Sequence, residues 1–140
     1  MTTAKRPEPV PNADSRPFWD AAREGILRAP KCRACGRISF PPKPACPTCR
    51  GTAFDWVDLS GRGTLKGWSR IHIAALPDRD PPITVVEVML AEDARATLVA
   101  LDDTGAVEGL APDAPLVIGF IEDANGWSYP LVRPVGAEGV

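Results

Sequence analysis

The chain has 140 residues and a formal net charge of −2; 44% of its residues are hydrophobic and 24% are charged. This size fits one compact domain or two very small ones, and it excludes a (β/α)₈ barrel, which needs about 250 residues. The longest strongly apolar stretch, residues 83–90, is interrupted by Glu87 and is too short to cross a bilayer. The first residues contain no apolar secretory segment, so we expect a cytoplasmic protein.

Charge and proline divide the chain into two unlike parts. Residues 1–50 contain ten Lys and Arg against four Asp and Glu, whereas residues 51–140 contain six against fourteen. Nine of the 16 prolines precede residue 51. Because proline lacks a backbone donor and fixes φ, the first part cannot be a continuous helix or a central strand. The asymmetry predicts two units with different surfaces.

A short amphipathic helix is predicted over residues 14–29, after a polar tail (1–13) that we expect to be disordered. Asp14 and Ser15 are candidate N-caps. Apolar side chains then recur at three- and four-residue spacing: Phe18, Trp19, Ala22, Ile26 and Leu27. A helix of this length is marginal alone, so its aromatic face must pack on something. That surface is either the rest of this chain or a partner subunit, for which Phe18 and Trp19 are candidate docking residues.

The cysteines form two C-x-x-C pairs that are separated by ten residues. They are Cys32, Cys35, Cys46 and Cys49. Two intervening residues let both sulfurs of a pair point at one centre, and Gly36 and Gly51 are expected to supply the positive φ of each turn. Two such turns give a closed tetrahedral S₄ site, which is the preferred geometry of structural zinc. The sequence therefore predicts a rubredoxin-like zinc ribbon over residues 30–53, with these cysteines as ligands of one ion.

Other uses of the cysteines are weighed against zinc. Iron in a rubredoxin-like centre is the main alternative, because sulfur ligands and tetrahedral geometry suit both metals. Two disulfides need an oxidising compartment, to which nothing in the sequence directs the chain. A thioredoxin-like pair needs a single C-x-x-C in a βαβ setting, which the flanking prolines exclude. Few apolar residues surround the cysteines, so the metal should supply most of the folding free energy of this segment.

From residue 54 onward the hydrophobic period changes to two. The predicted strands are 54–59, 63–74, 83–90, 94–101, 115–122 and 127–133, each bounded by Gly, Pro, Asp or Asn. Five or six short strands without intervening helices predict a five-stranded OB-fold barrel over residues 54–135, followed by a flexible tail at 136–140. The fold class is therefore mainly β, with a short helix and a zinc ribbon before the barrel.

The residues offer little for catalysis. The chain has a single histidine, His72, and no nucleophile elbow, phosphate loop or dinucleotide-binding motif. The carboxylate pairs at 92–93 and 102–103 lie in predicted turns, where solvation explains them. We therefore expect no active site of its own.

One strand combines cations with an indole ring. By alternation Lys66, Trp68 and Arg70 share one face, opposite Leu65. Two cations and an indole can hold a phosphate and stack on a nucleobase, as the head of coenzyme A requires. The candidate ligand-binding residues are therefore these three and Arg62 in the preceding turn. A solvated outer face of a barrel strand explains the same pattern.

The whole arrangement resembles the zinc-ribbon plus OB-fold family, formerly a domain of unknown function, that accompanies thiolase-like enzymes in acyl-CoA metabolism. The matching stretches are FWDAAREGIL, CRACGRISFPPKPACPTC, SGRGTL and the closing RP, within residues 17–134. The resemblance implies a non-catalytic accessory subunit that binds acyl-CoA. It also implies docking on a thiolase-fold protein or a hot-dog-fold hydratase, in lipid or polyketide-like metabolism.

Two other functions use the same modules. Ribbons and OB barrels also bind single-stranded nucleic acid, although an isoelectric point near 5.4 and the acidic second part of the chain oppose this. A rubredoxin-like electron carrier would hold iron and would be coloured. Metal analysis and oligonucleotide binding discriminate these functions from the accessory role.

Overall fold

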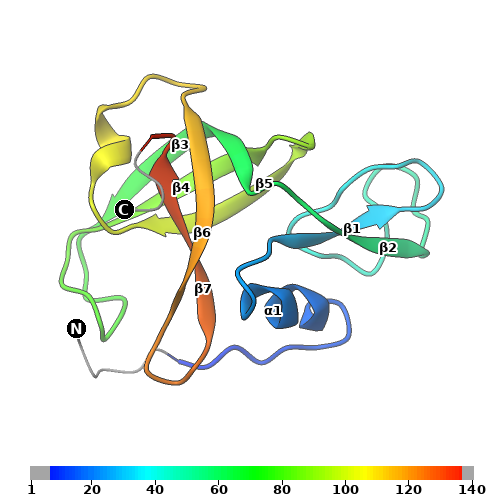
Figure 1. Ribbon diagram of the computed structural model, residues 1–140, viewed down its shortest axis with the longest axis horizontal. Helices are drawn as coiled ribbons and strands as arrows, with labels where there is room; N and C mark the ends of the chain where they lie inside the picture. Colours follow the sequence, from blue (N-terminus) through cyan, green and yellow to red (C-terminus); the bar gives the residue numbers. More distant parts are fainter. Residues whose placement is uncertain (1–6, 137–140) are drawn as a thin grey trace.

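A computed structural model describes residues 7–136 and shows a barrel with a smaller lobe at its side (Figure 1). The lobe contains α1 (Arg16–Ala22), β1 (Arg28–Cys32) and β2 (Phe54–Asp58). The barrel contains β3 (Arg62–Ile71), β4 (Ile83–Leu90), β5 (Asp93–Asp102), β6 (Pro115–Glu122) and β7 (Ser128–Pro134), with a 3₁₀ helix, η1 (Ala106–Gly109), between β5 and β6. Of the two expected tails, residues 1–6 and 137–140 lie outside the described part, and residues 7–12 have no regular secondary structure.

The five barrel strands close in the order β3-β4-β5-β7-β6, and β6 pairs back to β3. Neighbouring strands are antiparallel except β5 and β7, which pair in parallel at Leu101 and Leu131. This closed barrel is consistent with an OB fold and confirms the predicted fold class. No helix among residues 7–136 is long and apolar enough to span a membrane.

Alternating side chains of the strands fill the barrel. Val86 and Val88 on β4 are fully buried, as are Leu98 on β5 and Leu116 on β6. The two strands β3 and β4 approach closely at Gly63, where an added Cβ would lie 2.4 Å from the Met89 carbonyl oxygen. The period-two pattern of the sequence therefore corresponds to an inward and an outward face, as predicted.

The helix is shorter than the predicted range 14–29. It ends at Ala22, and Gly25 then adopts a left-handed φ of 75°, which a side-chain-bearing residue rarely takes. The following residues turn back as β1 and pair with β2, from Arg28 opposite Asp58 to Cys32 opposite Phe54. Strand β2 therefore belongs to the ribbon sheet, and the first barrel strand begins at Arg62, after the predicted start of the barrel at residue 54.

Helix α1 packs on the rest of this chain through aromatic side chains. The Phe18 ring centroid lies 5.2 Å from that of Phe40 in the ribbon and 6.2 Å from that of Phe120 on β6. Trp19 meets Trp127 and Tyr129 edge-on, at centroid distances of 5.9 and 5.8 Å. Phe18 is 5% exposed and belongs to the core cluster, which favours packing within this chain, while its role in docking a partner stays a prediction.

Candidate metal centre

The two C-x-x-C turns have the same backbone hydrogen bonds. In each turn the N–H of the first cysteine donates to the carbonyl five residues later, at 2.8 Å. The N–H of the fourth residue after that cysteine donates back to the cysteine carbonyl, at 2.9 Å in the first turn and 2.8 Å in the second. The residues involved are Cys32, Gly36 and Arg37 in the first turn and Cys46, Arg50 and Gly51 in the second.

The two turns differ in how they supply the left-handed residue. Gly36 adopts a φ of 78° as predicted, but in the second turn Arg50 adopts this conformation, with a φ of 64°, and Gly51 does not. At Gly51 the space for a side chain is small instead. An added Cβ there would lie 3.3 Å from Cys49 Sγ and 3.5 Å from Cys32 Sγ.

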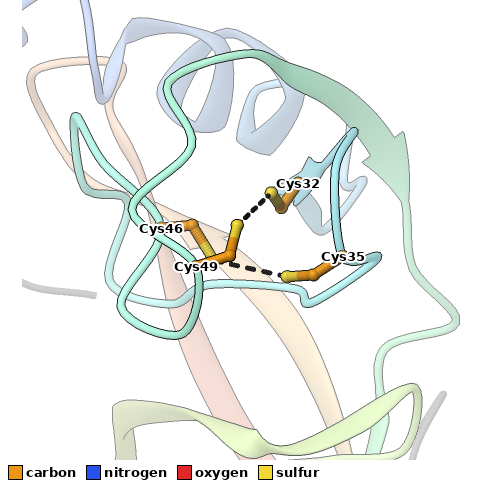
Figure 2. A group of neighbouring side chains, drawn as sticks. All are labelled: Cys32, Cys35, Cys46 and Cys49. Atoms are coloured by element: carbon orange, nitrogen blue, oxygen red, sulfur yellow. Dashed lines mark hydrogen bonds between the residues drawn. The ribbon is translucent and has the colours of Figure 1, made fainter.

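The fold brings all four predicted ligand sulfurs together (Figure 2). Every pair of sulfurs lies within 4.8 Å, with Cys32 Sγ and Cys49 Sγ at 3.4 Å and Cys35 Sγ and Cys46 Sγ at 3.6 Å. A disulfide requires about 2.05 Å, so these are free thiols. Zn–S bonds of about 2.3 Å in a tetrahedron place sulfurs about 3.8 Å apart. The sulfur set therefore has the donor chemistry and the size of a structural zinc site.

Backbone amides lower the pKa values of these thiols, whereas neighbouring sulfurs lower the pKa of Cys32 and Cys46 and raise that of Cys49. The N–H of Cys49, more than any other group, lowers the pKa of Cys46 to about 6, and the N–H of Cys35 lowers the pKa of Cys32. Cys49 receives the N–H of Gly51, yet the adjoining thiols raise its pKa to about 12. Four crowded sulfurs do not all ionise without a cation among them, so a divalent metal would displace the remaining protons.

Two acidic residues at the start of β5 connect the ribbon lobe to the barrel. Glu92 Oε2 accepts the N–H of Ser60 at 2.7 Å, and Asp93 Oδ2 accepts the N–H of Ile38 at 3.2 Å. The Arg95 guanidinium, hydrogen-bonded to Asp93, holds the pKa of that carboxyl at about 2. The expectation that solvation alone explains this acidic pair is wrong. No local pattern predicts the contact with Ile38, because 55 residues separate the two partners.

Asp93→Asn is expected to lower the free energy of unfolding by about 1–2 kcal/mol at pH 7, because a carboxylate with a depressed pKa stabilises the folded state when ionised. The ordinary pKa is 3.8 and the folded value is about 2. The contribution is therefore present above about pH 4 and is lost as the pH falls toward 2. Urea unfolding at several pH values measures it, with Asp20→Asn on the exposed side of α1 as control. A difference that persists unchanged at pH 2 would contradict this explanation.

The predicted ligand residues of β3 do not share one face. A bulge shifts the register between Leu65 and Gly67, and Trp68 then lies opposite Val86, whose side chain is fully buried. Because the extra residue, Lys66, reverses the alternation, Trp68 and Arg70 lie on the same face as Leu65 and not on the opposite one. The predicted grouping of Lys66 with these two residues is therefore wrong.

The charged side chains of Lys66 and Arg70 on β3 already form ion pairs with carboxylates of this chain. Lys66 Nζ lies 3.6 Å from Glu87 Oε2, and Arg70 Nε donates to Glu108 Oε1 at 2.9 Å. Arg70 also lies 5.5 Å from the ring centroid of Trp68 and lines a cavity of about 570 Å³ at the barrel end. Most of the charged side chains in that cavity are carboxylates: Asp78, Asp80, Asp102, Asp103 and Glu108. Such a lining disfavours a phosphate group.

Comparison with known proteins identifies the family. The family model "ChsH2, rubredoxin-like zinc ribbon domain" matches residues 19–55, and "ChsH2, C-terminal OB-fold domain" matches residues 56–119. A DUF35 domain-containing scaffold protein of Methanothermobacter thermautotrophicus is 33% identical over 117 residues, which are 81% of this chain and 79% of that protein. The chain belongs to the DUF35 family. This confirms the resemblance found in the sequence.

Two further matches are to an enzyme subunit and to a solved structure that contains a DUF35 protein. A probable enoyl-CoA hydratase alpha subunit of Thermomonospora curvata is 31% identical over 136 residues, or 94% of this chain. The match covers only 40% of that relative, so the chain spans less than half of its length. A solved structure titled "Ltp2-ChsH2(DUF35) aldolase" aligns with a TM-score of 0.78 and 28% identity, over 91% of this chain and 98% of that chain.

Proposed function

We propose that this DUF35 chain is a non-catalytic accessory subunit of an acyl-CoA-processing enzyme. Its partner would be a thiolase-fold protein or a hot-dog-fold hydratase in lipid or polyketide-like metabolism. The likeness to nearly the whole of a chain whose structure is titled an Ltp2-ChsH2 aldolase carries the proposal. The match to part of a hydratase alpha subunit supports it, because there the same unit is joined to further sequence.

The roles of the polar residues in the described part support an accessory role. His72 is exposed just beyond β3. Asp102, which is 5% exposed, accepts the N–H groups of Thr104 and Val107 and thereby holds η1. Glu108 is occupied by Arg70 and by the hydroxyl of Thr84. These carboxylates therefore have structural roles, and catalysis is assigned to the partner.

The four cysteines are proposed to bind one structural Zn²⁺. When bound, the ion would link the two C-x-x-C turns and would supply no open position for a substrate. Thiols without disulfides are what a reducing compartment maintains, which supports a cytoplasmic location. Zinc in a colourless protein is the expected result of metal analysis, whereas iron with visible absorption bands would favour the electron carrier.

Acyl-CoA is proposed to bind to the assembled complex more tightly than to this chain alone. Lys66 and Arg70 are ion-paired in the isolated chain, while Trp68, which is 38% exposed, can offer its ring to an adenine. Arg62 is exposed at the start of β3, at a different place on the barrel. Calorimetric titration with acetyl-CoA, on the chain and on the complex, measures this difference.

Co-expression with a thiolase-like protein or a hydratase tests the accessory role. We expect the two proteins to purify together at a fixed stoichiometry, and we expect the partner to gain solubility or activity. Separate elution of the two proteins at micromolar concentration would contradict the proposal. Tight binding of a single-stranded oligonucleotide at low salt would favour the nucleic-acid function instead.

A further inference from the structure

A charged pair at the start of β5 reaches from the barrel to the ribbon. Arg95 donates from Nε to Asp93 Oδ1 at 2.9 Å and from Nη2 to Oδ2 at 2.8 Å. The Arg95 backbone N–H also donates to Oδ1, at 3.1 Å. The Asp93 side chain is 10% exposed and that of Arg95 is 56% exposed. The two-point pairing therefore fixes the direction of the guanidinium, although much of it meets solvent.

The same carboxylate is bound to the ribbon backbone. Asp93 Oδ2 accepts the N–H of Ile38, which bridges to Lys31, the residue before Cys32. Residue 38 also follows Arg37, whose carbonyl accepts the N–H of Cys32. The charged pair of the barrel therefore lies against the backbone that forms the first C-x-x-C turn.

The charges of two sulfurs also act on the guanidinium, in addition to the contacts with Asp93. The hydrogen bond to Asp93 is the main reason that the pKa of Arg95 is raised, but the negative charges of Cys35 and Cys46 raise it further. These two cysteines belong to different turns. The raised pKa values of Arg28 and Arg70 arise from carboxylates alone, so the influence of sulfur distinguishes Arg95 from them.

We infer that Arg95 is an outer-sphere residue of the metal centre, a cation that the barrel links, through Asp93, to the backbone beside the first C-x-x-C turn. This inference rests on the proposed zinc assignment. Four thiolates and one Zn²⁺ carry a net charge of −2, so a fixed cation nearby stabilises the metal-bound state relative to the protonated, metal-free state. The ribbon therefore retains its metal best while it is docked on the barrel, and metal binding and docking reinforce each other.

The test compares zinc release from purified zinc-loaded proteins. The variants are Arg95→Gln, which removes the charge, and Arg95→Lys, which keeps it. Arg70→Gln is the matched control, because Arg70 also binds one carboxylate, Glu108, but no cysteine influences it. The chelator 4-(2-pyridylazo)resorcinol reports the rate of release at pH 7, and circular dichroism verifies that each variant is folded.

We expect Arg95→Gln to release zinc about tenfold faster than the wild type, since loss of an outer-sphere partner costs about 10–100-fold in metal affinity. Arg95→Lys and Arg70→Gln should stay close to the wild type, and 1 M NaCl should reduce the effect of Arg95→Gln by screening. Equal release rates for Arg95→Gln and Arg70→Gln would overturn the inference. So would release from Arg95→Lys as fast as from Arg95→Gln, because the charge would then not matter. A wild-type protein without zinc would overturn the metal assignment as well, whereas the accessory role is tested separately by co-purification.

Discussion

Replacing Cys46 by serine is expected to abolish stoichiometric zinc binding and to unfold the ribbon, while the barrel keeps its strands. Cys46 is buried, and its sulfur lies 3.6 Å from that of Cys35, so serine would remove a ligand from the inner side of the site. Three remaining thiolates cannot close a tetrahedral structural site. The expected loss is a large part of an apparent binding free energy of order 10 kcal/mol.

The ribbon has little else to hold it. Among residues 33–53 only Ile38, Ser39 and Cys46 are buried, so the apolar area removed from water is small. Its regular pairing is limited to the five positions shared by β1 and β2 and to the single bridge between Lys31 and Ile38. The barrel, in contrast, closes through its own strands, and most residues of the core cluster belong to it. Loss of the metal should therefore melt the ribbon first.

Metal analysis and two-dimensional amide NMR measure the outcome. Cys46→Ser should contain little zinc and should lose the dispersed ribbon resonances, while those of the barrel strands remain. Thr48→Ser is the matched control, because it changes a residue of the same turn and keeps the hydroxyl that accepts from Arg37 at 2.7 Å. EDTA treatment of the wild type should reproduce the effect of Cys46→Ser. A variant that retains one zinc and an intact ribbon would refute a structural role for Cys46.

Local signals explain which parts of the fold and of the metal site could be predicted. The cysteine spacing gives a metal site because the two residues between cysteines fix the turn, and period-two segments give barrel strands because each strand has one buried face. The end of the helix was not predicted, because the apolar spacing continues through Leu27. Leu27 is indeed buried, but it follows the turn at Gly25 and lies next to β1, not on the helix. Strand β1 was missed because it contains Pro30, which is tolerated in a two-stranded ribbon.

Non-local contacts explain the remaining differences. One extra residue at Lys66 reverses the side on which Trp68 lies, and the neighbouring Gly67, a residue type that often marks a bulge inside a strand, is the local signal for it. Asp93 and Arg95 look like solvated charges beside a turn, and only the approach of the ribbon gives them a role. The barrel therefore contributes to the metal centre through residues that no cysteine motif contains.

Phe18→Ala is expected to lower the free energy of unfolding by about 3–5 kcal/mol, the cost of removing a buried aromatic side chain. Phe18 is 5% exposed and its ring contacts Trp19 on the helix, Phe40 in the ribbon and Phe120 in the barrel. The substitution would leave a cavity where these three parts of the chain meet. Both the ribbon and the helix should therefore lose their hold on the barrel.

Urea unfolding measures this loss, and Phe18→Leu is the matched control, because it keeps most of the apolar volume and should cost less than half as much. The result separates the two roles that the sequence leaves open for this aromatic face. A docking residue would lose partner binding on substitution and leave the stability of the isolated chain within about 0.5 kcal/mol. Such an outcome would contradict the packing of Phe18 in this structure. A large loss of stability in the isolated chain would instead show that Phe18 holds the helix, the ribbon and the barrel together.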